Sequence, residues 1–548
     1  MLNIIKPYSN KLRSFCPVKK TSTIILLLII FLALGLRVYG ITWGLPNEIH
    51  KLSYHPDERN IFYAASNLDL NSLDLNPNYF YYPTFHIYFF VLIIQLMVNE
   101  LILSSTTILI GRLITAGFGV LSVYLLFLIG KEFKNEEVGL ISALFFAIVP
   151  IHVVHSHYLT NDVPVTFWVL TSLFCCFKII KYKNLKWYIL AGFTGGLGIS
   201  TKYTAGLIVL PILTSHFLNL SFVDQKFSIK NTKKIFISLI VLTIIFILTS
   251  PYVVLSSFES VRDIAQITTY LNTPNPEWFD TGNGVVYHIR ESIYYGIGAA
   301  LLLLSLYGAV FSFKKNKHNN ILLFSFIVPY ILWVGKWEVR FSRFILPIIP
   351  LLLILAASTL YDLNSKSKTA AILVFLITFS YTIIGTASYE RLFVNEDPRD
   401  SAHIWMDKSI PRSSKIGLLP TFQSRFNFFL PPINENELIF TWNHSELKER
   451  NVDYFILSDI DYRFYLKSEK SKTKYSSEVD FINYLFSGKD YKLEKTFHNP
   501  QKFLFIDLSD EYLPHDMKYQ NPEILVFKRK LTDNWTKNTK TNTGGMQI

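Results

Sequence analysis

The chain has few charged residues and few cysteines for its length. Only 17% of the 548 residues are charged, and the 3 cysteines are Cys16, Cys175 and Cys176. Cys16 precedes the first apolar run and the other two lie within a later one, so segments outside a membrane have no disulfide framework. Half of the residues are hydrophobic, and apolar runs recur between residues 23 and 388, which is more apolar surface than one soluble core can bury. The composition therefore predicts a polytopic α-helical membrane protein.

A nucleic-acid partner is not expected, although the formal net charge is +12. The lysines fall in short clusters between apolar runs, a pattern that is typical of the cytoplasmic loops of membrane proteins. We therefore interpret the positive charge as a signal of topology and not as a binding surface for polyanions.

The N-terminal segment, residues 1–22, is basic and is followed by an apolar run at residues 23–43. This run is long enough to span a bilayer and no small-residue cleavage pattern follows it, so we expect a first span with a cytoplasmic N-terminus instead of a signal peptide. Arg37 lies near the outer end of this span, where it is either a snorkelling side chain or a partner for an acid in the next loop.

The apolar run at residues 85–103 decides the rest of the topology. If it were a second span, every later loop would change side and five lysine clusters would lie outside the membrane. These clusters are Lys131/Lys134, Lys178 to Lys186, Lys226 to Lys234, Lys314 to Lys317 and Lys366/Lys368. A helix along the outer membrane face places all of them inside, so we predict an interfacial helix.

The remaining apolar runs bring the number of transmembrane helices to about eleven. After the first span they cover roughly residues 107–130, 137–157, 163–181, 187–199, 204–219, 235–255, 291–313, 321–335, 344–361 and 369–388. Two of them, 187–199 and 204–219, are shorter than the ~20 residues of a full crossing, so we expect broken or tilted helices there.

The composition changes sharply near residue 389, where charged and polar residues return. Short alternating apolar runs predict strands at residues 415–419, 454–457, 503–506 and 524–527. We therefore predict a transmembrane module over residues 23–388, with a long outer loop at 44–106, and a C-terminal mixed α/β soluble domain over 389–531 on the same side as that loop. Residues 532–548 are rich in Thr, Asn and Lys and are expected to be disordered.

The stretch Tyr54-His55-Pro56-Asp57-Glu58-Arg59 places two adjacent acids in the outer loop. The predicted topology brings further ionisable and polar residues from distant parts of the chain to the same membrane face. They are His155, His157, Asn161, Asp162, Lys202, Arg262, Asp263, His288, Glu338, Arg340 and Arg343. Few charges lie at mid-span, so we expect any chemistry to take place at this face.

This set of residue types suits glycosyl transfer from a lipid-linked donor. A carboxylate can accept the proton of an acceptor hydroxyl as it attacks a sugar carbon, and Lys or Arg can stabilise a departing phosphate without a general acid. A polyprenyl-phosphate sugar is the expected donor, because its tail can lie in the bilayer while its head group reaches the outer loop. One carboxylate and a cationic clamp favour single displacement with inversion over the two-carboxylate arrangement of retaining glycosidases. No metal or other cofactor is expected, because His152, His155 and His157 have no tight ligand spacing.

The order of short motifs resembles a known enzyme family. The motifs are Arg37, His55-Pro56-Asp57-Glu58, Tyr82-Pro83, Gly111-Arg112, Pro150, Asp162, Gly195-Gly196-Leu197, Thr201-Lys202, Arg343-Phe344-Ile345-Leu346-Pro347 with Pro350, and Ala402/Trp405. In this order and spacing they resemble the dolichyl-phosphate-mannose protein mannosyltransferases of glycosyltransferase family 39, which include the lipid A aminoarabinose transferases and have the GT-C fold. The resemblance covers residues 20–415.

The resemblance implies roles for individual residues. Asp57 would be the catalytic base with Glu58 beside it, Asp162 would be a second acid that positions substrates, and Lys202 and Arg343 would bind the donor phosphate. We add Arg262, Arg340 and Tyr82 as candidates for donor binding, and Arg37, His55 and His157 as supporting residues. Two departures are Tyr82-Pro83-Thr84 in place of the commoner double proline and a C-terminal domain without MIR repeats. They favour a bacterial or archaeal type of enzyme and leave the acceptor open: a protein, a glycan or a lipid.

Simpler interpretations remain for each residue. Asp57 and Glu58 could be surface charges, Asp162 a helix N-cap, Lys202 an interface anchor and Arg340 a snorkelling side chain. The aromatic run at residues 79–82 could be part of an aromatic belt. For the whole chain, the alternatives are a transporter or lipid-handling protein without catalysis and an inactive scaffold that presents its soluble domain.

Overall fold

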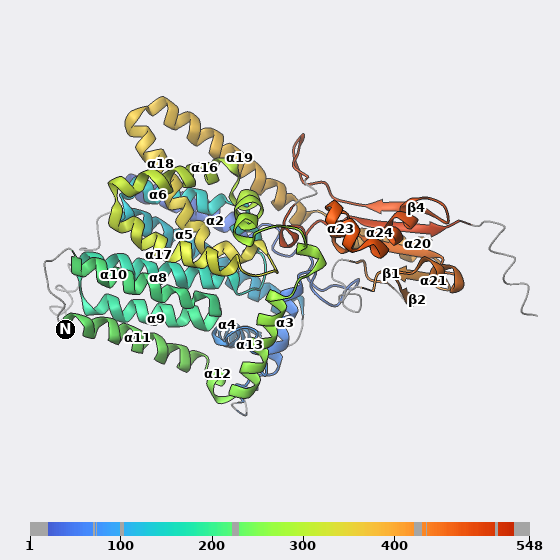
Figure 1. Ribbon diagram of the computed structural model, residues 1–548, viewed down its shortest axis with the longest axis horizontal. Coiled ribbons are helices and arrows are strands. Elements are labelled where there is room, and N and C mark those ends of the chain that lie inside the picture. The colour runs from blue at the N-terminus through green and yellow to red at the C-terminus, as the bar shows by residue number, and fades with distance from the viewer. Residues whose placement is uncertain are drawn as a thin grey trace, which may run out of the picture.

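The structure is a computed structural model that describes residues 20–69, 72, 74–98, 104–221, 229–420, 430–433, 436–509 and 513–530. The predictions for the N-terminal residues 1–19 and for the tail 532–548 fall outside the described residues. Two regions are visible in Figure 1, a helical bundle and, at one end of it, a smaller region with a sheet.

The helical bundle contains the chain from α2 to α19 (Figure 1). Its first helices are α2 (Lys20–Val38), α3 (Pro56–Ser66), α4 (Phe85–Val98), α5 (Ser105–Phe133), α6 (Glu136–Ile148), α7 (Pro150–His155), α8 (Asp162–Tyr182) and α9 (Leu185–Thr201). The middle part has η1 (Tyr203–Ile208), α10 (Val209–Ser221), α11 (Ile229–Thr249), α12 (Tyr252–Leu255), α13 (Ser257–Asn272), η2 (Pro276–Trp278), α14 (Gly284–Tyr287) and η3 (His288–Ile293). The last helices are α15 (Tyr294–Ile297), α16 (Ala299–Lys315), α17 (Lys317–Val334), η4 (Ser342–Ile348), α18 (Ile349–Lys366) and α19 (Lys368–Val394).

The apolar runs of the sequence form these helices, and the predicted polytopic helical fold is confirmed. Among the described residues, six helices are long and apolar enough to cross a membrane: Lys20–Val38, Ser105–Phe133, Asp162–Tyr182, Thr232–Thr249, Ser342–Lys366 and Lys368–Ser409. Three shorter apolar helices are Phe85–Val98, Tyr203–Leu218 and Ala299–Phe313. The total of about eleven spans stays a prediction.

Helix α4 covers the run whose placement decided the topology. Its 14 residues extend over about 21 Å at 1.5 Å per residue, which is less than the ~30 Å hydrocarbon core of a bilayer. The described part of the helix is therefore shorter than a perpendicular crossing, and the interfacial placement stays a prediction. The predicted broken helix after residue 203 is present as the 3₁₀ helix η1 followed directly by α10.

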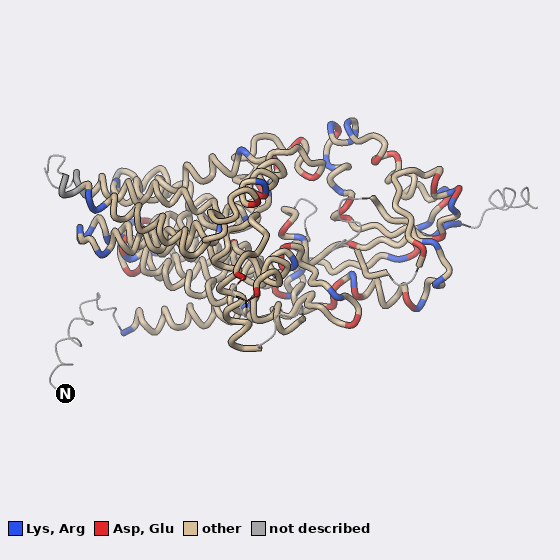
Figure 2. The backbone as a smooth tube through the Cα atoms, turned by 90° about the horizontal axis from the view of Figure 1, so that it is seen from below, with Lys and Arg blue, Asp and Glu red and all other residues tan. Residues whose placement is uncertain are grey.

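Lys and Arg residues gather at the end of the bundle that lies away from the sheet (Figure 2). Ion pairs connect the lysine clusters of separate loops there: Lys134 Nζ lies 2.9 Å from Asp362, Lys315 Nζ lies 3.3 Å from the same carboxylate, and Lys178 and Lys181 both contact Glu132. The clusters used for the topology thus share one end of the bundle, and the sheet region lies at the other.

The C-terminal region begins with α20 (Pro398–Ser409) and has a five-stranded mixed sheet of order β2-β1-β3-β7-β4. Its strands are β1 (Lys415–Leu418), β2 (Glu437–Phe440), β3 (Tyr454–Ser458), β4 (Tyr491–Phe497) and β7 (Ile524–Arg529). β1 pairs in parallel with β2 and β3, whereas β7 is antiparallel to β3 and β4. The remaining elements are α21 (His444–Glu449), α22 (Asp459–Tyr462), η6 (Arg463–Leu466), α23 (Glu469–Lys474), α24 (Ser476–Phe486), β5 (Lys502–Phe503), β6 (Ile506–Asp507) and η7 (His515–Met517).

Alternate side chains of β3 build a core on each face of this sheet. Tyr454 and Ile456 pack in one cluster with Met406 of α20, whereas Phe455 and Leu457 pack in the other with residues of α21 and α24. The period of two in the sequence therefore produces a helix–sheet–helix sandwich, and the predicted mixed α/β domain is confirmed.

The strand predicted at residues 503–506 is wrong. Lys502–Phe503 and Ile506–Asp507 are the two arms of a hairpin, and the chain turns at Leu504, which has a φ of 52°. Phe505 is 91% exposed at this turn. A short apolar run does not reveal whether its side chains are buried, so the same pattern fits a strand and a turn with exposed apolar residues.

Arg399 connects the two regions. Its Nη2 donates to Asp397 Oδ2 at 2.7 Å and to the Tyr519 carbonyl at 2.9 Å, and its guanidinium lies 3.7 Å from the centre of the Tyr54 ring. Trp43 Nε1 also donates to Asp397, at 3.1 Å. The outer loop after α2, the start of α20 and the segment before β7 thus meet at one buried guanidinium.

Candidate active site

The two adjacent acids of the outer loop lie in the first turn of α3. His55 has an extended backbone (φ −95°, ψ 119°) and its Nδ1 accepts a hydrogen bond from the backbone N–H of Asp57 at 3.3 Å. Pro56 follows at the first helical position, where a missing N–H has no cost. The sequence His-Pro-Asp-Glu therefore starts a helix with both carboxylates near its positive end.

The Glu58 side chain is fully buried, and both of its carboxylate oxygens accept hydrogen bonds. Arg112 of α5 donates to it through Nε at 2.7 Å and Nη2 at 2.9 Å, the Leu159 N–H donates at 2.8 Å, and the Ser53 hydroxyl donates as well. Burial by itself raises the pKa of Glu58, but the Arg112 guanidinium outweighs it and holds the pKa below its ordinary value. The geometry gives Glu58 the surroundings of a structural ion pair.

Asp57 faces a different group of residues, which we call the Arg343 cluster: Asp57, Asp162, Lys202, Arg343 and Asp516. Arg343 Nη2 lies 3.0 Å from Asp57 Oδ2, and its Nε lies 3.8 Å from Asp162 Oδ2. Lys202 Nζ donates to Asp162 Oδ1 at 2.6 Å. The structure thus brings Asp57, Asp162, Lys202 and Arg343 together from four separate segments, and their chemical roles stay predictions.

Three members of the cluster stand at or next to the end of a helix. Asp162 begins α8, Lys202 is the C-cap of α9, and Arg343 is the second residue of η4. Asn161 is the N-cap of α8 and makes no capping bond, and the Asp162 carboxylate binds Lys202. The ends of these helices lie close together in the bundle, so their side chains can contact one another.

The loop before α4 contributes two tyrosines, Tyr79 and Tyr82, near Asp57. Burial, and then the nearby Asp57 carboxylate, raise the pKa of Tyr79 and of Tyr82 above the ordinary tyrosine value, so both phenols are neutral. The backbone of this loop is held in place because the Phe80 N–H donates to Asp263 at 3.0 Å and Tyr203 donates to the Phe80 carbonyl at 3.2 Å.

Comparison with known proteins relates this arrangement to glycosyltransferases. Residues 87–254 match the family model described as dolichyl-phosphate-mannose-protein mannosyltransferase. Over 206 residues the chain is 25% identical to the putative mannosyltransferase YkcB of Bacillus subtilis (strain 168), a match that covers 36% of this chain and 27% of that protein. The matched part of the chain is therefore similar to the protein mannosyltransferases of glycosyltransferase family 39. It spans about a quarter of the length of this curated relative.

Solved structures show the fold over more of the chain. ArnT from Cupriavidus metallidurans in the apo state has a TM-score of 0.50 at 12% identity, covering 92% of this chain and 98% of that chain. The oligosaccharyltransferase AglB from Archaeoglobus fulgidus, solved with an inhibitory peptide and a dolichol-phosphate, has a TM-score of 0.50 at 11% identity, covering 81% and 70%. The predicted GT-C fold is confirmed.

Arg262 and Arg340, two candidates for donor binding, have other partners in this GT-C structure. Arg262 is 52% exposed on α13 and pairs with its neighbour Asp263 at 2.8 Å. Arg340 donates to Thr281 Oγ1 at 2.6 Å and to the Gly282 carbonyl at 2.8 Å, so it supports the loop between η2 and α14.

Two predicted supporting residues lie inside the bundle. Arg37 is fully buried and donates to the carbonyls of Ala33, Ala147 and Phe146 at 3.0 to 3.2 Å, and its Nη2 lies 2.8 Å from His152 Nδ1. The ring nitrogens of His157 lie 2.9 Å and 2.8 Å from the Val153 and Tyr39 carbonyls. These contacts fix the helices below the cluster.

A metal site is not apparent in the described part of the chain, where no group of three or more His, Cys, Asp or Glu side chains could hold an ion. The expectation that the protein needs no metal stays a prediction.

Sequence reasoning did not identify Asp516, and it named Arg112 only in the Gly111-Arg112 motif, without a role. Arg112 gives a sequence signal, because a charge inside an apolar run is costly unless it is paired. Asp516 gives none, since it is 173 residues away from Arg343 in the chain and belongs to the other region.

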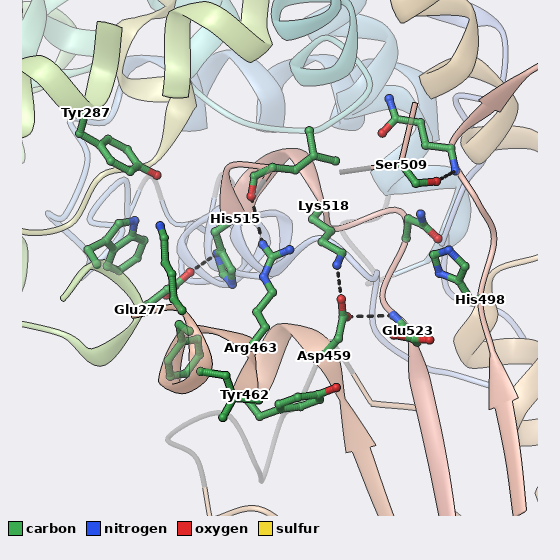
Figure 3. A pocket seen from close by; sticks show the side chains of 17 residues that line it. Glu277, Tyr287, Asp459, Tyr462, Arg463, His498, Ser509, His515, Lys518 and Glu523 are labelled. Atoms are coloured by element: carbon green, nitrogen blue, oxygen red, sulfur yellow. Dashed lines mark hydrogen bonds and ion pairs between the residues drawn. The ribbon is translucent and has the colours of Figure 1, made fainter. Parts of the chain in front are cut away.

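A cavity of about 570 Å³ lies between the loop that contains Glu277 and the C-terminal domain (Figure 3). His515 Nδ1 lies 2.8 Å from Glu277 Oε1 across it, and Lys518 pairs with Asp459 on the domain side. His515 directly precedes Asp516, so one short element, η7, lines the cavity and contributes to the Arg343 cluster.

Proposed function

We propose that the protein is a membrane glycosyltransferase that moves a sugar from a polyprenyl-phosphate donor to an acceptor hydroxyl with inversion. The observation that carries this proposal is the Asp57 carboxylate, 3.0 Å from the Arg343 guanidinium and next to the Asp162–Lys202 pair. A proton acceptor and two cations for a phosphate thus stand side by side. Support also comes from AglB, a protein of the same fold that was solved with a dolichol-phosphate.

The charges of the cluster define how the donor would bind. Two cations, Lys202 and Arg343, face three carboxylates, so a donor phosphate has to take the place of a carboxylate on Arg343. When the phosphate binds Arg343, Asp57 loses its partner and becomes available to an acceptor hydroxyl. The acceptor oxygen then attacks the anomeric carbon, Asp57 takes the hydroxyl proton, and the carbon–oxygen bond to the phosphate breaks. The cations stabilise the departing polyprenyl phosphate.

Buried polar atoms without partners are available for the sugar and the phosphate. Among the buried atoms of the described segments that have no hydrogen-bond partner are His55 Nε2, Thr160 Oγ1, both amide atoms of Asn161, and Arg343 Nη1, which lies 3.5 Å from Asp516 Oδ2 in an ion pair. Other buried atoms of the described chain also lack partners, so the support for a ligand site is their position: they belong to residues next to Asp57 and Asp162 in the chain and to Arg343.

The activity can be tested with purified protein and a set of polyprenyl-phosphate sugars. Release of polyprenyl phosphate is expected from the wild type, and Asp57→Asn should reduce it by about 10²- to 10⁴-fold, the usual contribution of a general base. Glu137→Gln, on the exposed start of α6, is the matched control and should retain full activity. Full activity of Asp57→Asn would show that Asp57 is not the base, and no release with any donor would contradict the proposed function.

The orientation of the chain is part of the proposal. With the basic end of the bundle in the cytoplasm, the Arg343 cluster and the C-terminal domain are extracytoplasmic. A membrane-impermeant thiol reagent should label Ser477→Cys in intact cells and should label Lys186→Cys only after lysis, since both positions are exposed at opposite ends. The reverse pattern would contradict this orientation.

A further inference from the structure

Asp516 belongs to the C-terminal domain, yet its carboxylate lies within the helical module. It is the central residue of η7 and is fully buried. Oδ1 accepts from the Ser342 N–H at 2.9 Å and from the Ser342 hydroxyl at 2.8 Å, and Oδ2 accepts from the Arg343 N–H at 2.8 Å. All three donors belong to the first two residues of η4.

These contacts cap η4 from another part of the chain. The first N–H groups of a helix have no partner within the helix, and a side chain at the N-cap usually supplies one. Here the N-cap is Phe341, which has no polar side chain and makes no capping bond. The Asp516 carboxylate performs this task, so it determines where the backbone of Arg343 lies.

The same carboxylate also contacts the functional end of Arg343. Arg343 Nη1 lies 3.5 Å from Asp516 Oδ2, whereas Nη2 lies 3.0 Å from Asp57. The Phe341 ring covers the guanidinium at 3.8 Å from its centre. One terminal nitrogen is therefore directed toward Asp516 and the other toward the candidate base, which leaves the planar group little freedom to turn.

The charge of Asp516 is maintained despite burial. Burial by itself raises its pKa, but His155, whose Nε2 lies 3.6 Å away, together with Arg343 and the two N–H donors, holds the pKa below the ordinary value. The lowered pKa favours the ionised carboxylate, so Asp516 and Arg343 form an ion pair that joins both regions of the protein.

We propose that Asp516 is a positioning residue of the transfer site: it orients Arg343 toward the donor phosphate and makes the C-terminal domain part of the donor-binding machinery. This inference rests on the proposed function, since it assigns the phosphate to Arg343. It predicts that Asp516 acts on donor affinity through Arg343 and not on the proton transfer itself.

The test uses the full-length protein and measures both donor turnover and direct binding of polyprenyl phosphate. Asp516→Ala should raise the KM for the donor and the Kd for polyprenyl phosphate by about 10- to 100-fold, the usual cost of losing hydrogen bonds to a charged group, with a smaller change in kcat. Asp516→Asn keeps an oxygen acceptor for η4 and should fall between the wild type and Asp516→Ala. It also provides the measurement if Asp516→Ala does not fold.

A double-mutant comparison tests whether Asp516 affects donor binding through Arg343. Arg343→Ala should weaken polyprenyl-phosphate binding, and adding Asp516→Ala should weaken it no further, because residues that act as a unit are not additive. The control is Asp453→Asn, a carboxylate of the same domain that pairs with Arg529 at 2.7 Å and should leave donor KM unchanged. Wild-type donor binding in folded Asp516→Asn and Asp516→Ala, or additive effects, would overturn the inference. Absence of donor binding by the wild type would overturn the proposed function as well.

Discussion

Asp57 and Glu58 are neighbours in the chain, but their surroundings are opposite in character. Glu58 is fully buried and accepts four hydrogen bonds around the Arg112 guanidinium. Asp57 retains 16% of its side-chain exposure and shares Arg343 with two other carboxylates. On a helix, adjacent side chains point about 100° apart, so one turn of α3 directs one acid into the bundle and the other toward Arg343.

The difference separates two uses of an ion pair. A carboxylate whose acceptor positions are all filled by protein donors has nothing left for a substrate, and its removal leaves an unpaired buried charge. A carboxylate that competes with others for one cation can release it when a phosphate arrives. We therefore expect the Glu58–Arg112 pair to determine stability and the Asp57–Arg343 pair to determine activity.

The largest effect is expected from a substitution that breaks the Glu58–Arg112 ion pair. Glu58→Gln leaves Arg112 as a buried charge without a counterion, which should lower the free energy of unfolding by about 3–5 kcal/mol. Thermal unfolding of the detergent-purified protein measures this loss. Asp57→Asn is the control from the adjacent position and should unfold close to the wild-type temperature. Equal losses in the two variants would contradict the separation of roles.

The second prediction concerns Lys202 of the Arg343 cluster, which we expect to affect activity more than stability. Lys202→Met keeps the length of the side chain but removes the cation from Asp162, and it should reduce kcat/KM for the donor by about 10- to 100-fold. The loss of stability should be smaller than that of Glu58→Gln, because Asp162 keeps Arg343 as a second cation, with Nε 3.8 Å from its Oδ2. Donor kinetics and thermal unfolding of the same preparation separate the two quantities. If the variant lost stability but not activity, Lys202 would have a structural role like that of Arg112.

Sequence patterns were sufficient for much of the fold. Long apolar runs predicted the helices of the bundle, and alternation at residues 454–457 predicted β3 and the two faces of its sheet. Such patterns are local: they depend on which residues recur every two or 3.6 positions. The hairpin turn at Leu504 shows their limit, since four apolar residues fit a strand and an exposed turn equally well.

The site was predictable in part, because topology is enough to place charges on a face. Helix ends brought Asp57, Asp162, Lys202 and Arg343 together, as the positions of the spans implied. The division between Asp57 and Glu58 was not predictable, since it depends on which way α3 rotates against α5. No local sequence pattern identifies Asp516. Its contact with Arg343 joins two distant regions of the chain and produces no periodicity in the sequence of either.

A third prediction tests the packing that seals Glu58. A Cβ added at Gly111 would lie 2.7 Å from Leu159 Cδ2, and the N–H of Leu159 donates to Glu58. Gly111→Ala should therefore push the loop of Leu159 away from α5 and cost about 1–3 kcal/mol of stability, as overpacking does. Gly117→Ala on the same helix meets no atom within 4 Å and is the matched control. Equal unfolding temperatures for the two variants would show that the loop adapts without strain.

The smallest effect is expected from pH, and it distinguishes the two carboxylates without changing the size of the site. Because the pKa of Glu58 is lower in the folded protein than its ordinary value, its ion pair stabilises the fold fully above the unfolded pKa of about 4.3 and loses this contribution as the pH falls through the folded value. The difference in unfolding free energy between wild type and Glu58→Gln should thus be constant from pH 8 to about pH 5.5 and shrink below about pH 4. Unfolding curves measured across this range, with Asp57→Asn as reference, provide the comparison. A difference that begins to shrink near pH 6 would mean that Arg112 does not hold the Glu58 carboxylate in its ionised form.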